Sequence, residues 1–211
     1  MIRIIVIERE FGAGAGSIAD KLAHRLGWKL LDHALTEEIA ALAKVSPETC
    51  KHCEERVDPW LYRLAKVFWR GSHERSVMLP DADIVDADRL ICLTQEVINQ
   101  AAAAGRCVIV GRAAVYFLRD RADTFCVFLF APREFKYQRI LAEVKNEAEA
   151  GRLLDTVDKE RKDFIRHYYN AEWPSRHLYH AMLNTAAGED ATVETILNLI
   201  EAANRREAPS A

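Results

Sequence analysis

Residues 4–26 read IIVIEREFGAGAGSIADKLAHRL, and this stretch decides the fold. It begins with four β-branched apolar residues, which are typical of a buried strand. It continues through a bend in which Gly12, Gly14 and Gly16 alternate with alanines, and a helical pattern begins near Ser17. Glycines let backbone N–H groups crowd around an anion, and a helix N-terminus adds partial positive charge. This order of elements predicts a cradle for the phosphates of a nucleotide.

The glycine-rich bend departs from both phosphate-binding motifs that it resembles. In the P-loop, G-x-x-x-x-G-K-[ST], a lysine reaches the terminal phosphates. Here Ser17 follows Gly16 and no lysine stands at that place. The dinucleotide fingerprint G-x-G-x-x-G fits Gly12 and Gly14 but fails at Ser17, although an acidic residue, Asp32, follows where the fingerprint expects one. The bend alone leaves open a kinase, a dinucleotide-binding oxidoreductase and a structural turn without a ligand.

The length and composition fit a single globular domain. The chain has 211 residues, of which 50% are hydrophobic and 29% charged, and its formal net charge is −3. This balance argues against disorder and against a broadly basic nucleic-acid-binding surface. We therefore expect one domain spanning residues 1–211, small-molecule partners and no nucleic acid. Homo-oligomer formation is left open.

Export and membrane insertion are not predicted. A strand already begins at residue 2, which leaves no room for a leader, and no apolar run approaches the roughly 18 residues of a membrane span. The five cysteines form no even disulfide framework. Cys50 and Cys53 form a C-x-x-C without a second pair, which favours an incidental helix surface over a metal site. We expect a cytoplasmic protein without a membrane partner or a metal site of its own.

Short apolar runs alternate with amphipathic helical patterns along the chain, which predicts an α/β fold in three layers, with a parallel five-stranded sheet and helices on both faces. The alternation breaks between about 33 and 105, which predicts a helical insertion beside the edge where the strands end. The strand candidates are 3–7, 28–31, 107–110, 124–130 and 179–183. The helix candidates are 17–26, 34–44, 59–69, 87–104, 133–144, 147–169 and 191–203.

A glycine–arginine pair, Gly111 and Arg112, follows the third strand candidate. In a parallel sheet this position lies at the ligand-binding edge, and the planar guanidinium suits bidentate binding of phosphate. Gly111 lets the chain turn closely toward a ligand. We interpret Arg112 as a phosphate-binding residue rather than as one partner of a surface salt bridge.

Asp155, Asp158 and Arg161 form the pattern D-x-x-D-x-x-R, and Arg166 follows five residues later. The spacing of three places the first three residues on roughly one helical face, so that a carboxylate can hold an arginine in place for a phosphate. Such arginines stabilise the charge of a phosphoryl group during its transfer. The spacing also fits a solvated, salt-bridged helix, and the pattern alone leaves the two interpretations open.

Six segments in order resemble the cytidylate kinase-like family, a branch of the P-loop nucleoside monophosphate kinases: EREFGAGAGSIADKLA, LLDHALTEEIA, GRCVIVGRAA, FLFAPREFKYQRI, DTVDKERKDFIRHYY and YHAMLNT. The resemblance covers nearly the whole chain. It implies a kinase that uses ATP and Mg²⁺, with CMP or dCMP as the acceptor. It also implies an acceptor-nucleotide region in the helical insertion and an arginine-bearing lid region at about 145–176.

The resemblance also implies roles for single residues. Asp32 would face the acceptor, and Arg112 would bind the phosphate of the acceptor. The loop residues that would hold the phosphates of ATP are Gly12, Ala13, Gly14, Ala15, Gly16 and Ser17. The residues that would take part in catalysis are Arg112, Asp158, Arg161 and Arg166.

Two departures from true cytidylate kinases bear on the activity. The P-loop lysine is absent, and Ala113 stands where those enzymes carry an aspartate after the G-R pair. Arg9 and Lys21 are the candidates for the missing positive charge. Because of the missing lysine, the alternative to a kinase is a nucleotide-binding regulatory protein with weak or no catalysis.

Overall fold

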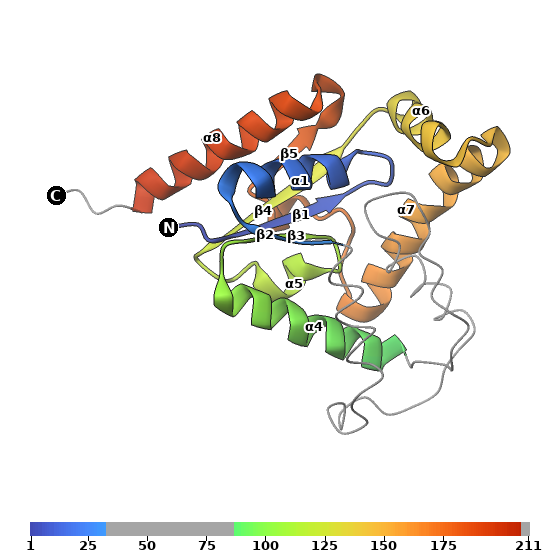
Figure 1. Ribbon diagram of the computed structural model, residues 1–211. Coiled ribbons are helices and arrows are strands. Elements are labelled where there is room, and N and C mark those ends of the chain that lie inside the picture. Colours follow the sequence, from blue (N-terminus) through green and yellow to red (C-terminus); the bar gives the residue numbers. More distant parts are fainter. Residues whose placement is uncertain (33–86, 208–211) are drawn as a thin grey trace.

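A computed structural model describes residues 1–32 and 87–207, and within these ranges the chain folds around a five-stranded parallel sheet (Figure 1). The order of the strands is β2-β3-β1-β4-β5, so β1 lies at the centre. The first four residues of β1, 4–7, are all apolar, as expected where helices cover both faces of a sheet. The strands are β1 (Ile4–Arg9), β2 (Lys29–Leu31), β3 (Cys107–Val110), β4 (Thr124–Phe130) and β5 (Ala181–Asn184).

The register of β1 decides which residues face each layer of helices. Ile4 pairs with Cys107 of β3 on one side and with Thr124 of β4 on the other. Side chains alternate along a strand, and Ile4 and Val6 accordingly belong to a different core from that of Ile5 and Ile7. By the same alternation Glu8 continues the face of Ile4 and Val6.

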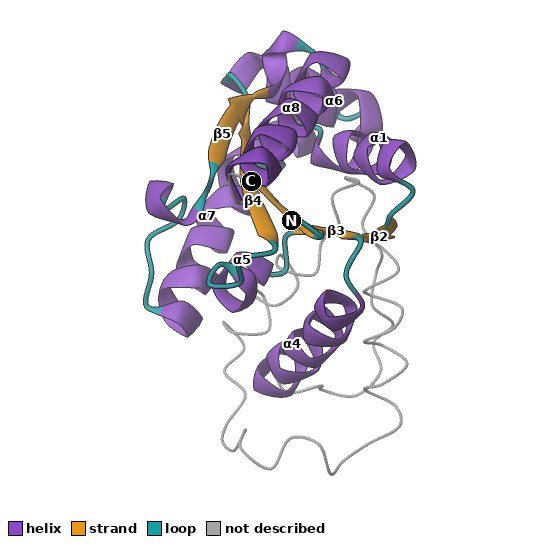
Figure 2. Cartoon of the chain, turned by 90° about the vertical axis from the view of Figure 1, so that its left-hand side faces the viewer, coloured by secondary structure: helices purple, strands orange, loops and turns teal. Residues whose placement is uncertain are grey.

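Two helical layers enclose the sheet (Figure 2). On one face, α1 (Ala15–Leu26) and α8 (Glu189–Glu207) pack over Ile5 and Ile7. On the other face lie α4 (Ala87–Ala104), the short α5 (Ala114–Leu118) and the C-terminal part of α7 (Glu147–Tyr169). A third, smaller core joins α6 (Arg133–Val144) to the first turns of α7. Short 3-10 helices, η1 (Arg176–Leu178) and η2 (Thr185–Ala187), flank β5.

The predicted α/β class, the parallel sheet and the helices on both faces are confirmed. The bounds predicted for α4, α6 and α7 agree with the structure. The prediction started α1 two residues too late, because Gly14, with φ 74°, already forms a left-handed N-cap and the helix begins at Ala15. The sequence analysis did not predict α5. The helices predicted at 34–44 and 59–69, and the Cys50–Cys53 pair, lie outside the described residues.

The interpretation as a dinucleotide-binding oxidoreductase is wrong. In that fold the second strand lies beside the first, in the order 3-2-1-4-5-6. Here β3 lies between β1 and β2, and Val6 pairs with Ile109. The G-x-G that opened this interpretation therefore belongs to a sheet of different topology.

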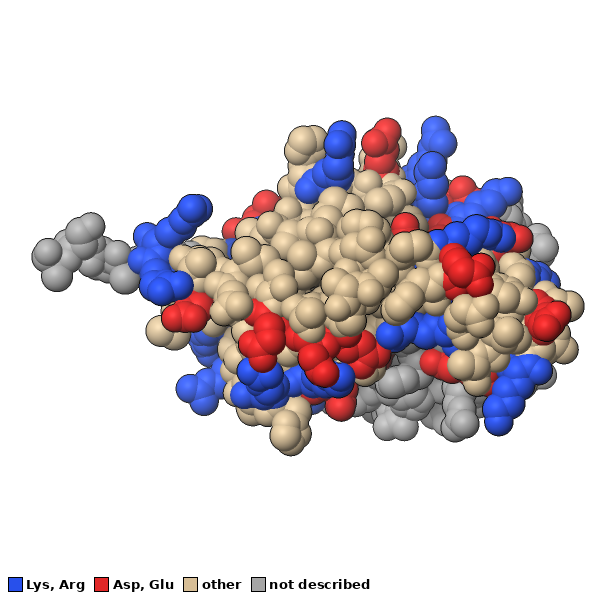
Figure 3. Space-filling view, turned by 90° about the horizontal axis from the view of Figure 1, so that it is seen from above, with Lys and Arg blue, Asp and Glu red and all other residues tan. Residues whose placement is uncertain are grey.

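The surface seen over α1, α6 and α8 carries basic and acidic groups that are interspersed (Figure 3). Ion pairs join α1 to α8 on this side, among them Arg25 with Glu194 at 2.7 Å. None of the helices in the described ranges combines the length and the apolar character that crossing a bilayer requires.

Candidate phosphate-transfer site

All the predicted site residues except Arg166 lie near the edge of the sheet where β1, β2 and β3 end and α1 begins. In open parallel sheets this edge is where ligands bind. Gly12 and Gly14 lie in the loop after β1, Asp32 follows β2 and Arg112 follows β3. The third side of the site is formed by α6 and α7, which lie beside the loop in Figure 1.

The loop from β1 to α1 has the shape that an anion requires. Gly12 and Gly14 have φ angles of 80° and 74°, which side chains with a Cβ rarely adopt. The first hydrogen bond of α1 runs from the N–H of Ile18 to the carbonyl of Gly14, at 3.3 Å. The N–H groups of residues 15–17 therefore precede the first hydrogen bond of the helix. They form the positive end of the helix dipole.

The helix α6 lies directly against this loop. A Cβ on Gly12 would come within 3.0 Å of the Cβ and the carbonyl oxygen of Lys136. A Cβ on Gly14 would collide with the guanidinium of Arg139. Gly12 is thus required by the close approach of the α6 backbone as well as by its backbone angle, whereas Gly14 is required by its backbone angle and leaves room for the Arg139 guanidinium.

A carboxylate from the start of α8 reaches the first turn of α1. Glu189 accepts a hydrogen bond from the Ser17 hydroxyl at 2.5 Å and ion pairs with Lys21 at 3.1 Å and Arg139 at 3.0 Å. Burial alone would raise the pKa of Glu189, but the three donors outweigh it and hold the pKa below its ordinary value of 4.5. We call Ser17, Lys21, Arg139 and Glu189 the loop network.

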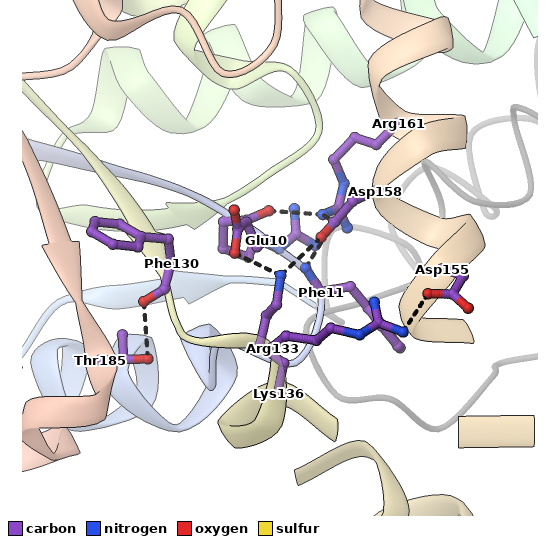
Figure 4. A network of polar contacts seen from close by, with 10 residues as sticks. Glu10, Phe11, Phe130, Arg133, Lys136, Asp155, Asp158, Arg161 and Thr185 are labelled. Carbon is purple, nitrogen blue, oxygen red and sulfur yellow. Dashed lines mark hydrogen bonds and ion pairs between the residues drawn. The ribbon is translucent and has the colours of Figure 1, made fainter. Parts of the chain in front are cut away.

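A second set of contacts ties the loop to α7 (Figure 4). Asp158 accepts a hydrogen bond from the N–H of Phe11 at 2.8 Å and pairs with Arg161 at 2.9 Å. Lys136 lies between Glu10, at 2.7 Å, and Asp158, at 3.7 Å. Burial raises the pKa of Asp158, and the positive charge of Arg161 opposes that shift. The predicted pairing of Asp158 with Arg161 on one helical face is confirmed.

Five charged residues are buried together at the ends of the strands. Arg161 donates to the carbonyl of Arg9 at 2.7 Å, and the guanidinium of Arg9 lies against Gly111. Arg112 interacts electrostatically with Arg9 and Asp32. We call these residues the buried charge cluster; their exposed fractions are 3% for Glu8, 5% for Arg9, 4% for Asp32, 2% for Arg112 and 5% for Arg161.

Burial shifts the pKa values of three members of the buried charge cluster, Glu8, Arg112 and Arg161. Burial and the neighbouring Arg9 lower the pKa of Arg112 to about 9 and that of Arg161 to about 10. Burial raises the pKa of Glu8, although the surrounding arginines oppose the shift. These three charges are therefore held at an electrostatic cost, and an incoming anion would relieve the repulsion that Arg9 exerts on Arg112 and Arg161.

A group of aromatic side chains surrounds Glu8 on the face of α4, α5 and α7. Tyr116 and Tyr169 stack at 4.6 Å between ring centroids, and the charge of Glu8 contributes to raising the pKa values of Tyr116, Tyr169 and Tyr179. In the described part of the chain, one oxygen of Glu8, the hydroxyls of these tyrosines and the Trp173 N–H are buried without a hydrogen-bond partner. Such groups need water or a ligand.

Two further residues of the predicted arginine-bearing helix, Arg166 and Asp155, do not reach the glycine loop. Arg166 is exposed, and its position five residues after Arg161 turns it about 140° around the helix. Its catalytic role stays a prediction. Asp155 pairs with Arg133 at 2.6 Å in an exposed position, so only the second half of the D-x-x-D-x-x-R pattern reaches the loop.

The sequence analysis missed three residues that contact the loop or its network: Lys136, Arg139 and Glu189. The signal for two of them was present, because Arg133, Lys136 and Arg139 repeat a basic residue every three positions along one helix. Glu189 carries no local signal, since it meets Ser17 from 172 positions away. In the described ranges no group of three or more His, Cys, Asp or Glu residues could hold a metal ion.

The sheet order, the glycine loop and the arginines at its edge define a P-loop kinase fold. The chain belongs to the cytidylate kinase-like family, whose sequence profile matches residues 4–187. Among solved structures, a gluconokinase from Sinorhizobium meliloti superposes with a TM-score of 0.55 at 17% identity, covering 98% of this chain and 97% of the other. An uncharacterized protein from Eubacterium ventriosum superposes with a TM-score of 0.67 at 20% identity, covering 95% and 99%. At these identities the likeness shows the fold.

A cytidylate kinase from Photorhabdus laumondii is 31% identical over 101 residues. The matched stretch covers 48% of this chain and 43% of that relative. The chain thus spans less than half the length of this curated relative. The kinase fold and the family are shown, whereas the acceptor and the reaction belong to the proposal that follows.

Proposed function

We propose that the protein is a nucleotide kinase that transfers the γ-phosphoryl group of ATP to a nucleoside monophosphate, with CMP or dCMP as the family-based acceptor. One observation carries the proposal: a glycine loop at a helix N-terminus and a cluster of buried arginines meet at the same edge of the sheet. The loop fits the donor phosphates, and Arg112 and Asp32 fit the acceptor.

Little covalent chemistry is required of the protein in this reaction. An oxygen of the acceptor phosphate bonds to the γ-phosphorus while the bond to the β–γ bridging oxygen breaks, and ADP leaves with that electron pair. The attacking oxygen is already ionised at neutral pH, so no general base is needed. Catalysis then rests on positioning and on charge neutralisation, which buried guanidinium groups supply without reorganising.

Arg161 is the residue best placed for the transition state. Its hydrogen bonds to Asp158 and to the carbonyl of Arg9 fix its guanidinium, which also lies 5.4 Å from the ring centroid of Trp173. Asp158 is its positioning residue. Arg112, from the other side, would hold the acceptor phosphate.

Mg²⁺ fits the oxygen donors beside the loop. The ion prefers few protein ligands together with water and the phosphates of its nucleotide. The Ser17 hydroxyl is a donor of this kind at the first turn of α1, whereas the Glu189 carboxylate beside it already pairs with Lys21 and Arg139. When bound with ATP, Mg²⁺ would neutralise charge on the β- and γ-phosphates.

The test is a panel of acceptors. Release of ADP is measured with ATP and Mg²⁺ and with CMP, dCMP, UMP, AMP or GMP, against a control without acceptor. We expect turnover with at least one pyrimidine monophosphate, and its loss in Arg112→Ala with ATP binding retained. Absence of acceptor-dependent turnover across the panel would contradict the proposal.

The missing lysine supports a second candidate, a nucleotide-binding regulatory protein. The structure moves the lysine position from Ser17, where the sequence analysis placed it, to residue 15, because Gly14 is the N-cap from which α1 begins. Residue 15 is alanine, so the usual contact with the terminal phosphates is absent. Thermal-shift measurements with ATP and with each monophosphate separate the two functions. Binding of nucleotides without turnover with any acceptor would favour the regulator.

A further inference from the structure

The absent lysine leaves a defined gap in the phosphate cradle. Gly14 ends the loop as the N-cap of α1 and so takes the place of the second glycine of G-x-x-x-x-G-K, although Arg9 stands at the place of the first glycine. The lysine position therefore falls on Ala15, whose side chain is buried with 2% exposure. A positive charge over the loop must come from another part of the chain.

The two candidates that the sequence offered lie elsewhere. The guanidinium of Arg9 lies against Gly111, between the ends of β1 and β3, and so belongs to the acceptor side. Lys21 is directed toward α8, where it binds Asp190 at 2.8 Å as well as Glu189. Neither of them covers Gly14.

Arg139 does cover Gly14. Its guanidinium occupies the space into which a Cβ on Gly14 would project, at the start of α1. Two contacts hold it there: the ion pair with Glu189 at 3.0 Å, and the ring of Phe135, whose centroid lies 5.3 Å from Cζ. The side chain is only 26% exposed, so it is placed by packing as well as by charge.

The charges around this position suit a phosphate. A cation at a helix N-terminus is disfavoured by the helix dipole unless an anion lies between them. In the structure that anion is Glu189, which collects donors from Ser17, Lys21 and Arg139. The arrangement of donors around its carboxylate is the kind that a phosphate oxygen requires.

We propose that Arg139 of α6 replaces the P-loop lysine and binds the terminal phosphates of the donor nucleotide. Glu189 is a positioning residue that holds the guanidinium over the loop. This inference rests on the proposed function, because it presupposes that the loop binds a nucleoside triphosphate.

The test compares Arg139→Ala with Arg133→Ala. Both substitutions remove one arginine from α6, but Arg133 is 67% exposed and pairs with Asp155, away from the loop. Dissociation constants are measured for adenosine, AMP, ADP and ATP, each with Mg²⁺, on variants whose circular dichroism matches the wild type.

A phosphate contact predicts losses that grow with the number of phosphates. Arg139→Ala should weaken ATP binding about tenfold or more and leave adenosine and AMP within about twofold, since a charge-assisted hydrogen bond is lost only where a terminal phosphate is present. Arg133→Ala should leave all four constants unchanged, and Arg139→Lys should recover part of the ATP affinity. Equal weakening of all four ligands, or no weakening, would overturn the inference.

A double variant tests the replacement directly. Ala15→Lys in the Arg139→Ala background restores a lysine at the usual position, and we expect it to regain ATP affinity over the single variant. A folded double variant without any gain would count against the inference. Failure of the wild type itself to bind ATP would instead overturn the proposed function, whereas unchanged ATP binding in Arg139→Ala overturns the inference alone.

Discussion

The loop network and the buried charge cluster handle charge in opposite ways. In the loop network every charged group has a partner within about 3 Å, and the side chains of Glu189 and Arg139 remain 22% and 26% exposed. In the buried charge cluster three guanidinium groups and two carboxylates are almost fully buried, and the pKa values of Arg112 and Arg161 are lowered.

This difference fits two tasks. Partly exposed ion pairs contribute little to stability and can exchange one partner for another when a ligand arrives. Buried charges are fixed before the ligand binds, so they need no reorganisation at the moment of reaction. We therefore expect substitutions in the buried charge cluster to have larger effects than those in the loop network.

The largest effect is expected for Arg161→Ala. It removes the donor of the Arg9 carbonyl and the arginine partner of Asp158, which then keeps the Phe11 N–H and the more distant Lys136. Breaking this buried pair should cost about 3–5 kcal/mol of unfolding free energy. Turnover should fall by about 10³-fold or more, far beyond any change in ATP affinity. Urea unfolding and steady-state kinetics measure the two effects. Arg161→Lys keeps the positive charge but loses the planar guanidinium with its several donors. Turnover equal to that of the wild type in either folded variant would show that Arg161 takes no part in the mechanism.

Arg112→Met separates function from stability. Burial lowers the pKa of Arg112 to about 9, so a neutral side chain of similar length removes a charge that is held at a cost, but it also takes a cation away from the buried Asp32. Because these two effects oppose each other, we expect the unfolding free energy to change less than in Arg161→Ala. Turnover should nevertheless fall about 10²-fold or more, because the acceptor phosphate loses its partner. A clear drop in the melting temperature would show instead that Arg112 mainly stabilises the fold.

Glu189→Gln probes the loop network through pH. The folded-state pKa of Glu189 lies below its ordinary value of 4.5, so its carboxylate stabilises the fold above pH 4.5 and loses that effect as the pH falls through the folded-state value. The variant should be less stable by about 1 kcal/mol at pH 7. The difference from the wild type should shrink on acidification. A difference that stays constant down to the acid range would contradict the assignment.

The smallest effect is expected where neither region is touched. Arg25→Ala removes an ion pair with Glu194 whose two side chains are 51% and 53% exposed. It should change the unfolding free energy by roughly 0–1 kcal/mol and leave turnover unchanged. Urea unfolding of this variant gives the baseline against which the other variants are compared. If Arg25→Ala lowered the unfolding free energy as much as Glu189→Gln, the loop network would be no more important for stability than an exposed ion pair.

Local patterns made most of the fold predictable from the sequence. The apolar run of β1, the glycine bend and the amphipathic helices repeat with the periods of strand and helix. The short α5, five residues long, has too few turns to show a helical period. Gly111 and Arg112 at a strand end were sufficient to predict where Arg112 lies.

The remainder of the site depends on contacts that are distant in sequence. Ser17 meets Glu189 across 172 positions, and Phe11 meets Asp158 across 147. No local period encodes such pairs, because they follow from how α6, α7 and α8 pack on the finished sheet. This is why the sequence indicated that a positive charge was missing but offered two residues that the structure places elsewhere.

Phe11 links the glycine turn after β1 to the packing of α6 against α7. Its ring belongs to the small core between α6 and α7, together with Ile140, Leu153 and Val157, while its amide is bound by Asp158. The glycine turn and the hairpin formed by α6 and α7 are therefore expected to open together, so a nucleotide that orders the turn should slow amide hydrogen exchange along α7. Reciprocity requires the converse: substitutions deep in the hairpin, far from any phosphate, would tune nucleotide affinity.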